Sequence, residues 1–230
     1  MTERHDYLFT GGAGQPLLPA LRNAILKATD IEIAVSFIQV SGLDLIFGDL
    51  EAALLSDRQV KLTLLTSDYL CITDPRALRK LMLLAERGAD IRIFQVGSSH
   101  SFHIKAYVFV QTSEGQTVSA DAFVGSSNIS KTALTDGLEW NYHIDFPNNK
   151  DLHAEARLQE IRQKFSDLLH LKQVARLNYP WIEQYELRYK QAAFNAVIPE
   201  VETVIRPLTH QAEALMALDA ARKRGISKGW

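Results

Sequence analysis

Short apolar segments alternate with amphipathic helical patterns over the first hundred residues of the chain. Residues 30–40, 59–69 and 89–97 are rich in β-branched and aliphatic side chains, which predicts three buried strands. Apolar residues at helical spacing predict helices over 17–28, 41–57 and 74–89. This alternation is typical of α/β proteins, in which helices cover both faces of a largely parallel sheet.

Three further strands are predicted between residues 103 and 146. Residues 103–111 and 121–127 have strand-like patterns, and the polar segment 112–120 between them indicates a hairpin connection. Residues 138–146 form another candidate strand. The strands of a hairpin are antiparallel, so the predicted fold class is a mixed α/β sheet flanked by helices and followed by a helical appendage.

The pattern changes after residue 148 to long, charged helical segments. Helices are predicted over 152–171 and 179–194, and two prolines within 195–207 indicate a linker. Residues 208–230 have the pattern of an amphipathic helix with a basic tail. The predicted organisation is an α/β domain over 1–148, a helical appendage over 149–198, and a linker with the start of a further domain over 199–230.

The charge distribution limits how the chain can bind an anionic partner. Residues 1–149 hold 12 basic and 17 acidic residues, a net charge of −5, whereas the whole chain carries −2. An acidic segment does not hold nucleic acid by bulk attraction. Any phosphate contact in this part of the chain must therefore come from a local cluster of basic groups.

The cysteine content and the hydropathy of the chain indicate its compartment. A single cysteine, Cys71, excludes an intramolecular disulfide and a multi-thiolate zinc site, which fits a reducing cytoplasm. The N-terminal sequence lacks the apolar stretch of a secretory signal, and no run of about 18 uncharged apolar residues occurs. We therefore expect a cytoplasmic protein without membrane contact.

Two costly polar side chains, His103 and Lys105, lie two residues apart in the predicted strand 103–111. Side chains of a strand alternate between its faces, so the imidazole and the ammonium point the same way. Burying an unpaired ammonium is unfavourable, so this face should meet solvent, a partner or an anion. The simpler alternative is an edge strand with one solvated face.

A second polar stretch follows the next predicted strand. Gly-Ser-Ser-Asn at 125–128 lies between that strand and a short helical pattern, and backbone amides in such a turn bind phosphate readily. Glu139 follows Asn128 by 11 residues. Tyr69, the last residue of the predicted segment 59–69, is a candidate substrate contact. Asp68 is interpreted as a turn residue.

The ordered set His-x-Lys, Gly-Ser-Ser-Asn and Gly-x-Glu-x-Asn resembles the phospholipase D superfamily, especially its bacterial nuclease and restriction-enzyme-like branch, over about residues 20–146. The resemblance implies that His103 attacks phosphorus and that Lys105 and Asn128 stabilise the phosphoryl oxygens. It further implies that Glu139 orients the imidazole. Ser126 or Ser127 would add a hydrogen bond to the phosphate, and the sequence leaves this choice open.

The chemistry of these side chains agrees with those roles. A neutral imidazole can be a nucleophile near pH 7, and a carboxylate on its other nitrogen stabilises the cation that forms. An ammonium and an amide stabilise developing negative charge without a metal. Neither an Asp-rich magnesium cluster nor a His/Cys zinc set occurs, so we expect no cofactor. One departure is Val110, where the full family pattern has Asp; this favours the nuclease-like branch over a lipase.

The motif is present in a single copy. The family mechanism uses two copies, in which the second histidine protonates the leaving group and later activates water. A chain with one copy is therefore expected to form a homodimer that shares an active site across a two-fold axis.

The C-terminal segment 205–225 resembles the sequence that precedes the nucleotide-binding loop of superfamily-two helicases. By this resemblance Gln211 would recognise adenine, and 199–230 would begin a truncated helicase-like domain. ATP and magnesium would be required only by that missing helicase part. The alternative is an ordinary C-terminal helix.

Together these observations predict a metal-independent phosphodiesterase or nuclease domain that acts on DNA or RNA through a phosphohistidine and is attached to a helicase. The first alternative is a nucleic-acid-binding accessory domain with weak or no turnover, which the Val110 departure favours. The second is a lipid phosphodiesterase, which the absence of an interfacial amphipathic helix disfavours.

Overall fold

The computed structural model describes residues 8–12, 14–96, 101–147 and 153–197. One compact unit extends over Met1–Ala192, and a second extends over Ala193–Trp230. The predicted adenine-binding residue Gln211 and the predicted helix over 208–230 lie outside the described residues.

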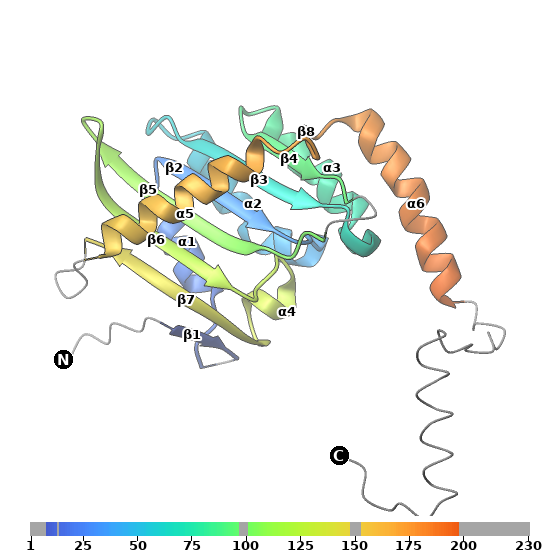
Figure 1. The fold of residues 1–230 in the computed structure, drawn as a ribbon, viewed down its shortest axis with the longest axis horizontal. Coiled ribbons are helices and arrows are strands. Elements are labelled where there is room, and N and C mark those ends of the chain that lie inside the picture. The colour runs from blue at the N-terminus through green and yellow to red at the C-terminus, as the bar shows by residue number, and fades with distance from the viewer. Residues whose placement is uncertain (1–7, 13, 97–100, 148–152, 198–230) are drawn as a thin grey trace, which may run out of the picture. The chain divides into compact units, whose positions relative to one another are not determined.

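An eight-stranded mixed sheet forms the centre of the first unit (Figure 1). Its strands lie in the order β1-β7-β6-β5-β2-β3-β4-β8, with β2, β3 and β4 parallel and the other neighbours antiparallel. The strands are β1 Leu8–Gly11, β2 Asp30–Val35, β3 Lys61–Ser67, β4 Asp90–Phe94, β5 Lys105–Ser113, β6 Gln116–Gly125, β7 Leu138–Phe146 and β8 Val174–Arg176. The predicted mixed α/β sheet is therefore confirmed.

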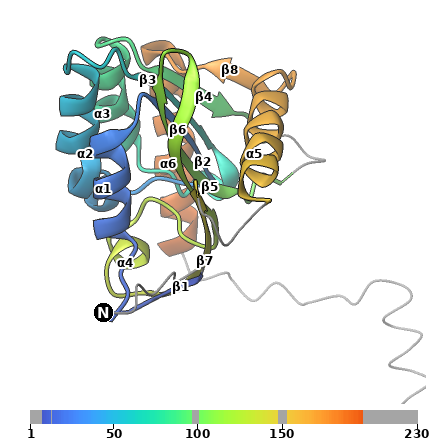
Figure 2. The same cartoon turned by 90° about the vertical axis from the view of Figure 1, so that its left-hand side faces the viewer.

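Helices cover both faces of the sheet. Figure 2 shows α1, α2 and α3 on one side and α5 on the other. The helices are α1 Leu18–Lys27, α2 Val40–Leu54, the 3-10 turn η1 Tyr69–Cys71, α3 Pro75–Ala85, α4 Lys131–Leu134, α5 Ala154–Leu169 and α6 Tyr179–Val197. The five helices predicted from periodicity are confirmed. In the described part of the chain, no helix combines the length and the apolar character that crossing a membrane requires.

The hairpin β5–β6 is longer than its sequence pattern predicts. The polar segment 112–120, expected as a connection, is mostly strand, and only Glu114 and Gly115 separate the two strands. Both residues have positive φ, 51° and 78°, as a two-residue hairpin turn requires. The polar pattern arises because most of this end of the hairpin is exposed, so its side chains do not need to be apolar.

Residues 153–192 pack against the sheet as part of the first unit. Helix α5 buries Leu158 and Phe165 against the sheet, and β8 pairs with β4. Helix α6 adds Ile182 and Tyr185 to the main core. Each of these helices buries only a narrow apolar stripe, and the other faces are charged and exposed.

An ion pair between elements far apart in the sequence holds α5 on the sheet. Arg162 of α5 donates from Nε and Nη2 to Oε1 of Glu32 in β2, at 2.9 and 2.7 Å. Both side chains are largely buried, and Oε2 of Glu32 is buried without a hydrogen-bond partner. The carboxylate therefore depends on this arginine for its stabilisation.

We predict that Arg162→Ala lowers the free energy of unfolding by about 3 kcal/mol, because Glu32 would keep a buried charge without its partner. Urea denaturation of the two proteins measures the difference. The matched control on the same helix is Lys164→Ala, whose ion pair with Asp167 is exposed; we expect a change below about 0.5 kcal/mol. Equal effects of the two substitutions would show that the Glu32 contact is not important for stability.

Candidate active site

The ends of six strands meet at one edge of the sheet. The parallel strands β2, β3 and β4 end there, β5 and β7 begin there, and β6 ends there, because the antiparallel neighbours run in the opposite direction. Residues near 36, 68, 104, 126 and 138 are therefore close in space. The predicted site residues come from these strand ends.

His103 and Lys105 lie side by side at the start of β5. The strand begins at Lys105, two residues later than predicted, so His103 belongs to the segment that enters it. Nζ of Lys105 is 2.7 Å from Nδ1 of His103 and donates to the His103 carbonyl oxygen at 2.9 Å. The imidazole is exposed, and its Nε2 makes no hydrogen bond to a described residue. Nε2 is therefore the accessible nitrogen.

The Lys105 ammonium is in an environment that disfavours its charge. Only 5% of the residue is exposed, although the pattern had suggested a face toward solvent or an anion. Burial lowers the pKa of Lys105, and the negative charge of Glu139 opposes this effect. An anionic group at this position would restore the stabilisation that burial removes.

Buried hydroxyl groups fix the segment that precedes His103. Ser36 donates from Oγ to the carbonyl oxygen of Phe102 at 2.7 Å. Ser67 donates to the Ser36 carbonyl, and Thr73 to the Ser67 carbonyl, each at 2.7 Å. The Phe102 ring is buried against Phe94, with ring centroids 5.0 Å apart. The backbone that positions His103 is thus tied to the ends of β2 and β3.

Asn128 is held so that its amide can donate to a ligand. Its Oδ1 accepts a hydrogen bond from the backbone N–H of Phe37 at 3.1 Å, and only 6% of the residue is exposed. The next residue, Ile129, pairs with Ile38 through an isolated parallel bridge. With Oδ1 occupied, the Nδ2 hydrogens are available as donors.

The structure distinguishes the two serines between which the sequence could not choose. Ser127 is fully buried; its Oγ accepts from Nδ2 of Asn141 at 2.8 Å, and its carbonyl oxygen accepts from the Tyr107 hydroxyl at 2.9 Å. Ser126 is exposed, and its Oγ donates to the Glu139 carboxylate. Ser126 is therefore the serine at the surface of the site, and Ser127 belongs to its interior.

Asn141 is a site residue to which sequence reasoning gave no role, although it stands in the Gly-x-Glu-x-Asn stretch. It is 1% exposed, and its amide is paired with Ser127 across the strands β6 and β7. Gly125 makes room for this amide, because a Cβ at position 125 would lie 2.7 Å from Oδ1 of Asn141 and 2.0 Å from the Trp140 carbonyl oxygen. The signal for Asn141 in the sequence was a polar residue at a strand position where a buried side chain is expected.

The Glu139 carboxylate contacts Ser126 and not the imidazole in this structure. Its hydrogen bond comes from the Ser126 hydroxyl, which also accepts from the Trp140 backbone N–H at 3.1 Å. The negative charge of Glu139 nevertheless acts on Lys105, because it partly offsets the lowering of the Lys105 pKa by burial. Glu139 is thus part of the charged cluster around His103, while the orientation of the imidazole by this residue stays a prediction.

Tyr69 lies against His103, and Asp68 has a structural role. The two rings meet edge to face with centroids 5.8 Å apart. Asp68 accepts from the backbone N–H of Val96 at 2.7 Å and pairs with Arg188 of α6 at 3.0 Å. This arrangement agrees with the interpretation of Asp68 as a turn residue and leaves Tyr69 beside the candidate nucleophile.

Val110, the position at which the chain departs from the family pattern, is fully buried on the face of β5 that packs against α5. It packs in an apolar cluster with Val108, Ala120, Ile144 and Leu158. A carboxylate among these aliphatic groups would be unfavourable unless it were paired. The valine is therefore consistent with its surroundings.

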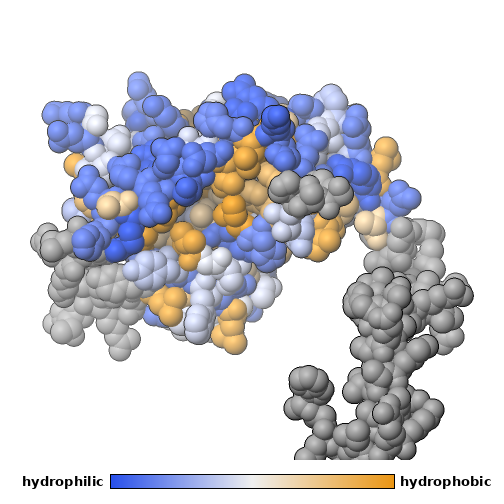
Figure 3. Space-filling model, viewed as in Figure 1, coloured by the Kyte–Doolittle hydropathy of each residue, from blue (hydrophilic) through white to orange (hydrophobic). Residues whose placement is uncertain are grey.

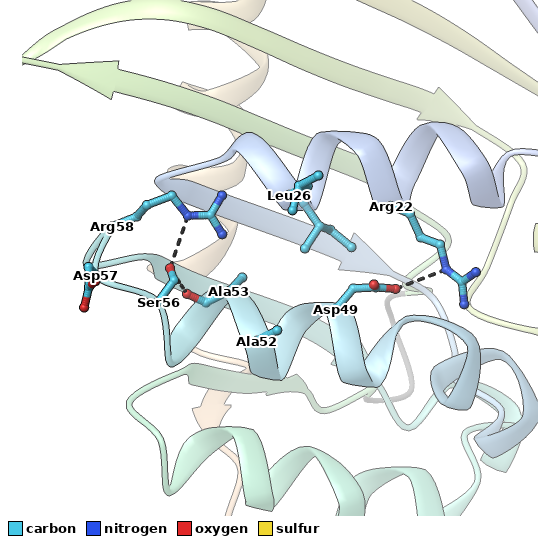
Figure 4. A pocket seen from close by; sticks show the side chains of 9 residues that line it. Arg22, Leu26, Asp49, Ala52, Ala53, Ser56, Asp57 and Arg58 are labelled. Atoms are coloured by element: carbon cyan, nitrogen blue, oxygen red, sulfur yellow. Dashed lines mark hydrogen bonds and ion pairs between the residues drawn. The ribbon is translucent and has the colours of Figure 1, made fainter.

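A separate groove of about 500 Å³ lies between α1 and α2 and the turn that follows α2 (Figure 4). Leu26, Ala52 and Ala53 line its apolar part. Its arginines have partners, since Arg22 pairs with Asp49 at 3.1 Å and Arg58 donates to Ser56 at 3.1 Å. None of the candidate site residues lines this groove. Within the described ranges, no group of three or more His, Cys, Asp or Glu residues could hold a metal ion.

Comparisons with known proteins give the following matches. Among solved structures, the chain is similar to Nuc, a phospholipase D family member from Salmonella typhimurium, with 18% identity, 75% of this chain and 98% of that chain covered, and a TM-score of 0.48. It is similar to NucT from Helicobacter pylori, with 15% identity, 64% and 87% covered, and a TM-score of 0.40. It is also similar to yeast tyrosyl-DNA phosphodiesterase, with 12% identity, 72% and 35% covered, and a TM-score of 0.38.

No curated protein sequence matches the chain significantly. The family model described as "Cardiolipin synthase, PLD-like domain" matches residues 21–169, which is more than half of the chain. This range contains His103, Lys105, Asn128 and Glu139, which come from the strand ends that carry the candidate site. The chain therefore belongs to the family of phospholipase D-like domains.

Proposed function

We propose that this domain is a metal-independent phosphodiesterase that cleaves nucleic acid, DNA or RNA, with His103 as its nucleophile. The observation that supports this proposal most directly is the exposed Nε2 of His103 beside the buried ammonium of Lys105. A nucleophile and a cation at this separation fit one phosphate group, whose phosphorus would meet the imidazole and whose oxygen would meet the ammonium.

In the first step Nε2 of His103 attacks phosphorus, a P–N bond forms, and the P–O bond to the leaving group breaks. Lys105 and the Nδ2 group of Asn128 stabilise the negative charge on the phosphoryl oxygens. The phosphate takes over the Lys105 ammonium from Nδ1, and the imidazole then carries its proton on Nδ1, so that the lone pair of Nε2 is free to attack. The negative charge of Glu139 then stabilises the positive phosphohistidine.

Both steps require a proton carrier that the single motif does not provide. The departing oxygen needs a proton, and water must later lose a proton as it attacks the phosphohistidine to regenerate free His103. Among the described residues, His143 is stacked on Phe123 and paired with Asp121 within the sheet, away from the strand ends. We therefore propose a homodimer in which His103 of a second subunit donates and accepts these protons.

Nucleic acid is preferred over lipid because an aromatic ring, Tyr69, lies against His103 and provides a surface for a nucleobase. The attachment to a superfamily-two helicase and the adenine-binding role of Gln211 stay predictions from the sequence, as does a cytoplasmic location.

A second candidate function is a phosphate-binding domain without turnover. It is favoured by two contacts, because Lys105 occupies Nδ1 of His103 and Glu139 is bonded to Ser126. In that case the same residues would bind a nucleic-acid phosphate, and the imidazole would not reach the orientation that attack requires.

We predict that His103→Ala lowers the rate of phosphodiester cleavage by about a thousandfold or more, because the nucleophile is removed. The assay is cleavage of bis(p-nitrophenyl) phosphate and of single- and double-stranded DNA in EDTA. His170→Ala is the matched control, since this histidine is exposed beyond the end of α5. Equal rates for His103→Ala and the unchanged protein would exclude the mechanism. An inactive wild type that still binds DNA would support the binding domain.

We predict that Lys105→Met raises the free energy of unfolding at pH 7 by about 1 kcal/mol while lowering the cleavage rate at least about 100-fold. At pH values below the lowered pKa of Lys105, the buried ammonium destabilises the fold. This cost disappears as the pH rises from that pKa toward 10.5, the ordinary pKa of a lysine. The stability advantage of the variant should therefore shrink in alkaline buffer.

Urea denaturation at several pH values tests the Lys105 prediction, with exposed Lys131→Met as the control. A less stable Lys105→Met protein at pH 7 would show that the hydrogen bonds of the ammonium outweigh the cost of its burial.

The two serines should respond differently to truncation. Ser127→Ala leaves the buried Asn141 amide without its partner and should lower the free energy of unfolding by about 1–2 kcal/mol. Ser126→Ala should change stability by less than about 0.5 kcal/mol but lower kcat about tenfold, because Glu139 loses a hydrogen bond. Thermal denaturation and the cleavage assay measure both effects, and the reverse pattern would contradict this assignment.

A further inference from the structure

The exposed Leu70 and the apolar surface beside α5 differ in their position relative to the candidate site. Figure 3 shows hydrophobic surface beside α5. Ala106 and Val108 of β5 line a pocket there, and successive side chains of a strand alternate, so this surface is on the face opposite Lys105. Leu70 of the η1 turn, in contrast, directly follows Tyr69, whose ring contacts His103.

The η1 turn has a backbone conformation that its residue types disfavour. Leu70 and Cys71 both have positive φ, 51° and 52°, in the left-handed region that glycine and asparagine adopt more readily. The turn is fixed by hydrogen bonds, since Cys71 N–H donates to the Asp68 carbonyl oxygen at 3.0 Å and Nε2 of Gln39 donates to the Ile72 carbonyl oxygen at 2.7 Å. Backbone held in this way is concentrated at ligand contacts and active sites.

Packing within the protein does not account for Leu70. Its neighbour Cys71 packs against the main core, whereas Leu70 belongs to none of the apolar clusters that the described residues form. The side chain is 69% exposed. The turn therefore holds a large apolar group in solvent at an unfavourable φ, next to the ring that touches the candidate nucleophile.

Tyr69 and Leu70 together offer an apolar surface for a nucleobase. The Tyr69 and His103 rings meet at an interplanar angle of 83°, and an edge-to-face contact occupies at most one face of either ring. A base can pack on these side chains only when it is unstacked from its neighbours. Bases of a single strand meet this condition, and those inside a duplex do not.

An exposed cation lies next to the turn. Nη1 of Arg188 in α6 is 3.0 Å from Oδ2 of Asp68, the residue before Tyr69, and the two side chains are 51% and 5% exposed. The guanidinium lies over the rings of Trp181 and Tyr185, 5.8 and 5.4 Å from their centroids. Among the described residues Asp68 is its one hydrogen-bond partner, so the guanidinium keeps donors for a phosphate.

We propose that the η1 turn binds single-stranded nucleic acid. A nucleobase next to the cleaved phosphate packs on Tyr69 and Leu70, and a neighbouring phosphate contacts Arg188. This inference rests on the proposed function, which places the cleaved phosphate at His103, and it adds the class of substrate. A duplex binds less tightly, because its stacked bases cannot reach Leu70.

The test of the base contact compares three ligands by fluorescence anisotropy in EDTA: oligothymidylate of about 12 nucleotides, an abasic strand of equal length, and a duplex, all with phosphorothioate linkages that slow cleavage. We expect the unchanged protein to bind oligothymidylate at least about tenfold more tightly than the other two. Leu70→Gly and Leu70→Asn should weaken only oligothymidylate binding, at least about fivefold.

Both Leu70 variants should fold, because glycine and asparagine tolerate a positive φ, and thermal denaturation checks this. The matched control is Leu26→Ala on α1, 70% exposed and away from the candidate site residues, which should leave all three dissociation constants unchanged.

The phosphate contact has a different signature. Arg188→Gln, whose amide can still donate to Asp68, should weaken binding of oligothymidylate and of the abasic strand equally. It should also reduce the slope of log affinity against log salt by about 0.7, the value for one phosphate of a single strand. Arg188→Lys keeps the charge and should restore the slope. Arg22→Gln is the control, since Arg22 is 50% exposed and paired with Asp49. An unchanged slope in Arg188→Gln would exclude this contact.

The outcomes separate this inference from the proposed function. Unchanged oligothymidylate binding in the Leu70 variants, or equal losses for oligothymidylate and the abasic strand, would overturn the base contact whatever the cleavage activity. Duplex binding as tight as single-strand binding would also overturn it. If the wild type and His103→Ala were equally inactive while the Leu70 variants lost base-dependent binding, the proposed cleavage would fail and the single-strand contact would stand.

Discussion

The placement of the Lys105 ammonium is the constraint on which the candidate site depends. A positive charge that is 95% buried needs compensation, and the protein provides it with the His103 carbonyl and imidazole and with the field of Glu139. The ammonium therefore fixes the orientation of His103 while its own charge remains incompletely stabilised. A bound phosphate would remove this deficit, so the arrangement that reduces stability would also increase affinity for an anion.

Other residues at the same strand ends keep His103 and Lys105 in place. Buried hydroxyls of Ser36, Ser67 and Thr73 join three loops to one another, and the Asn141 amide joins β6 to β7. These contacts are short polar connections inside an apolar core, where each lost partner is expensive. These hydrogen bonds therefore tie the described residues of the candidate site to one another and to the sheet.

The sequence predicted the elements with long, regular patterns and missed those whose formation depends on distant contacts. Periodicity identified β2 and α3, whereas β8, with three residues, exists only because β4 offers it an edge. The candidate site residues came from the resemblance of the ordered motif to the phospholipase D superfamily, and their roles stay predictions. The burial of Ser127 and the pairing of Asn141 could not be predicted, because both depend on Gly125 leaving space between two strands.

The link between α6 and the candidate site extends the set of residues on which that site depends. Arg188 provides the counter-charge of Asp68, and Asp68 in turn holds the backbone at Val96 beside the segment leading to His103. A fragment that ended at residue 148 would keep every motif residue and lose α5, β8 and this arginine. The motif therefore covers only part of the compact unit, which extends some forty residues beyond residue 148, to Ala192.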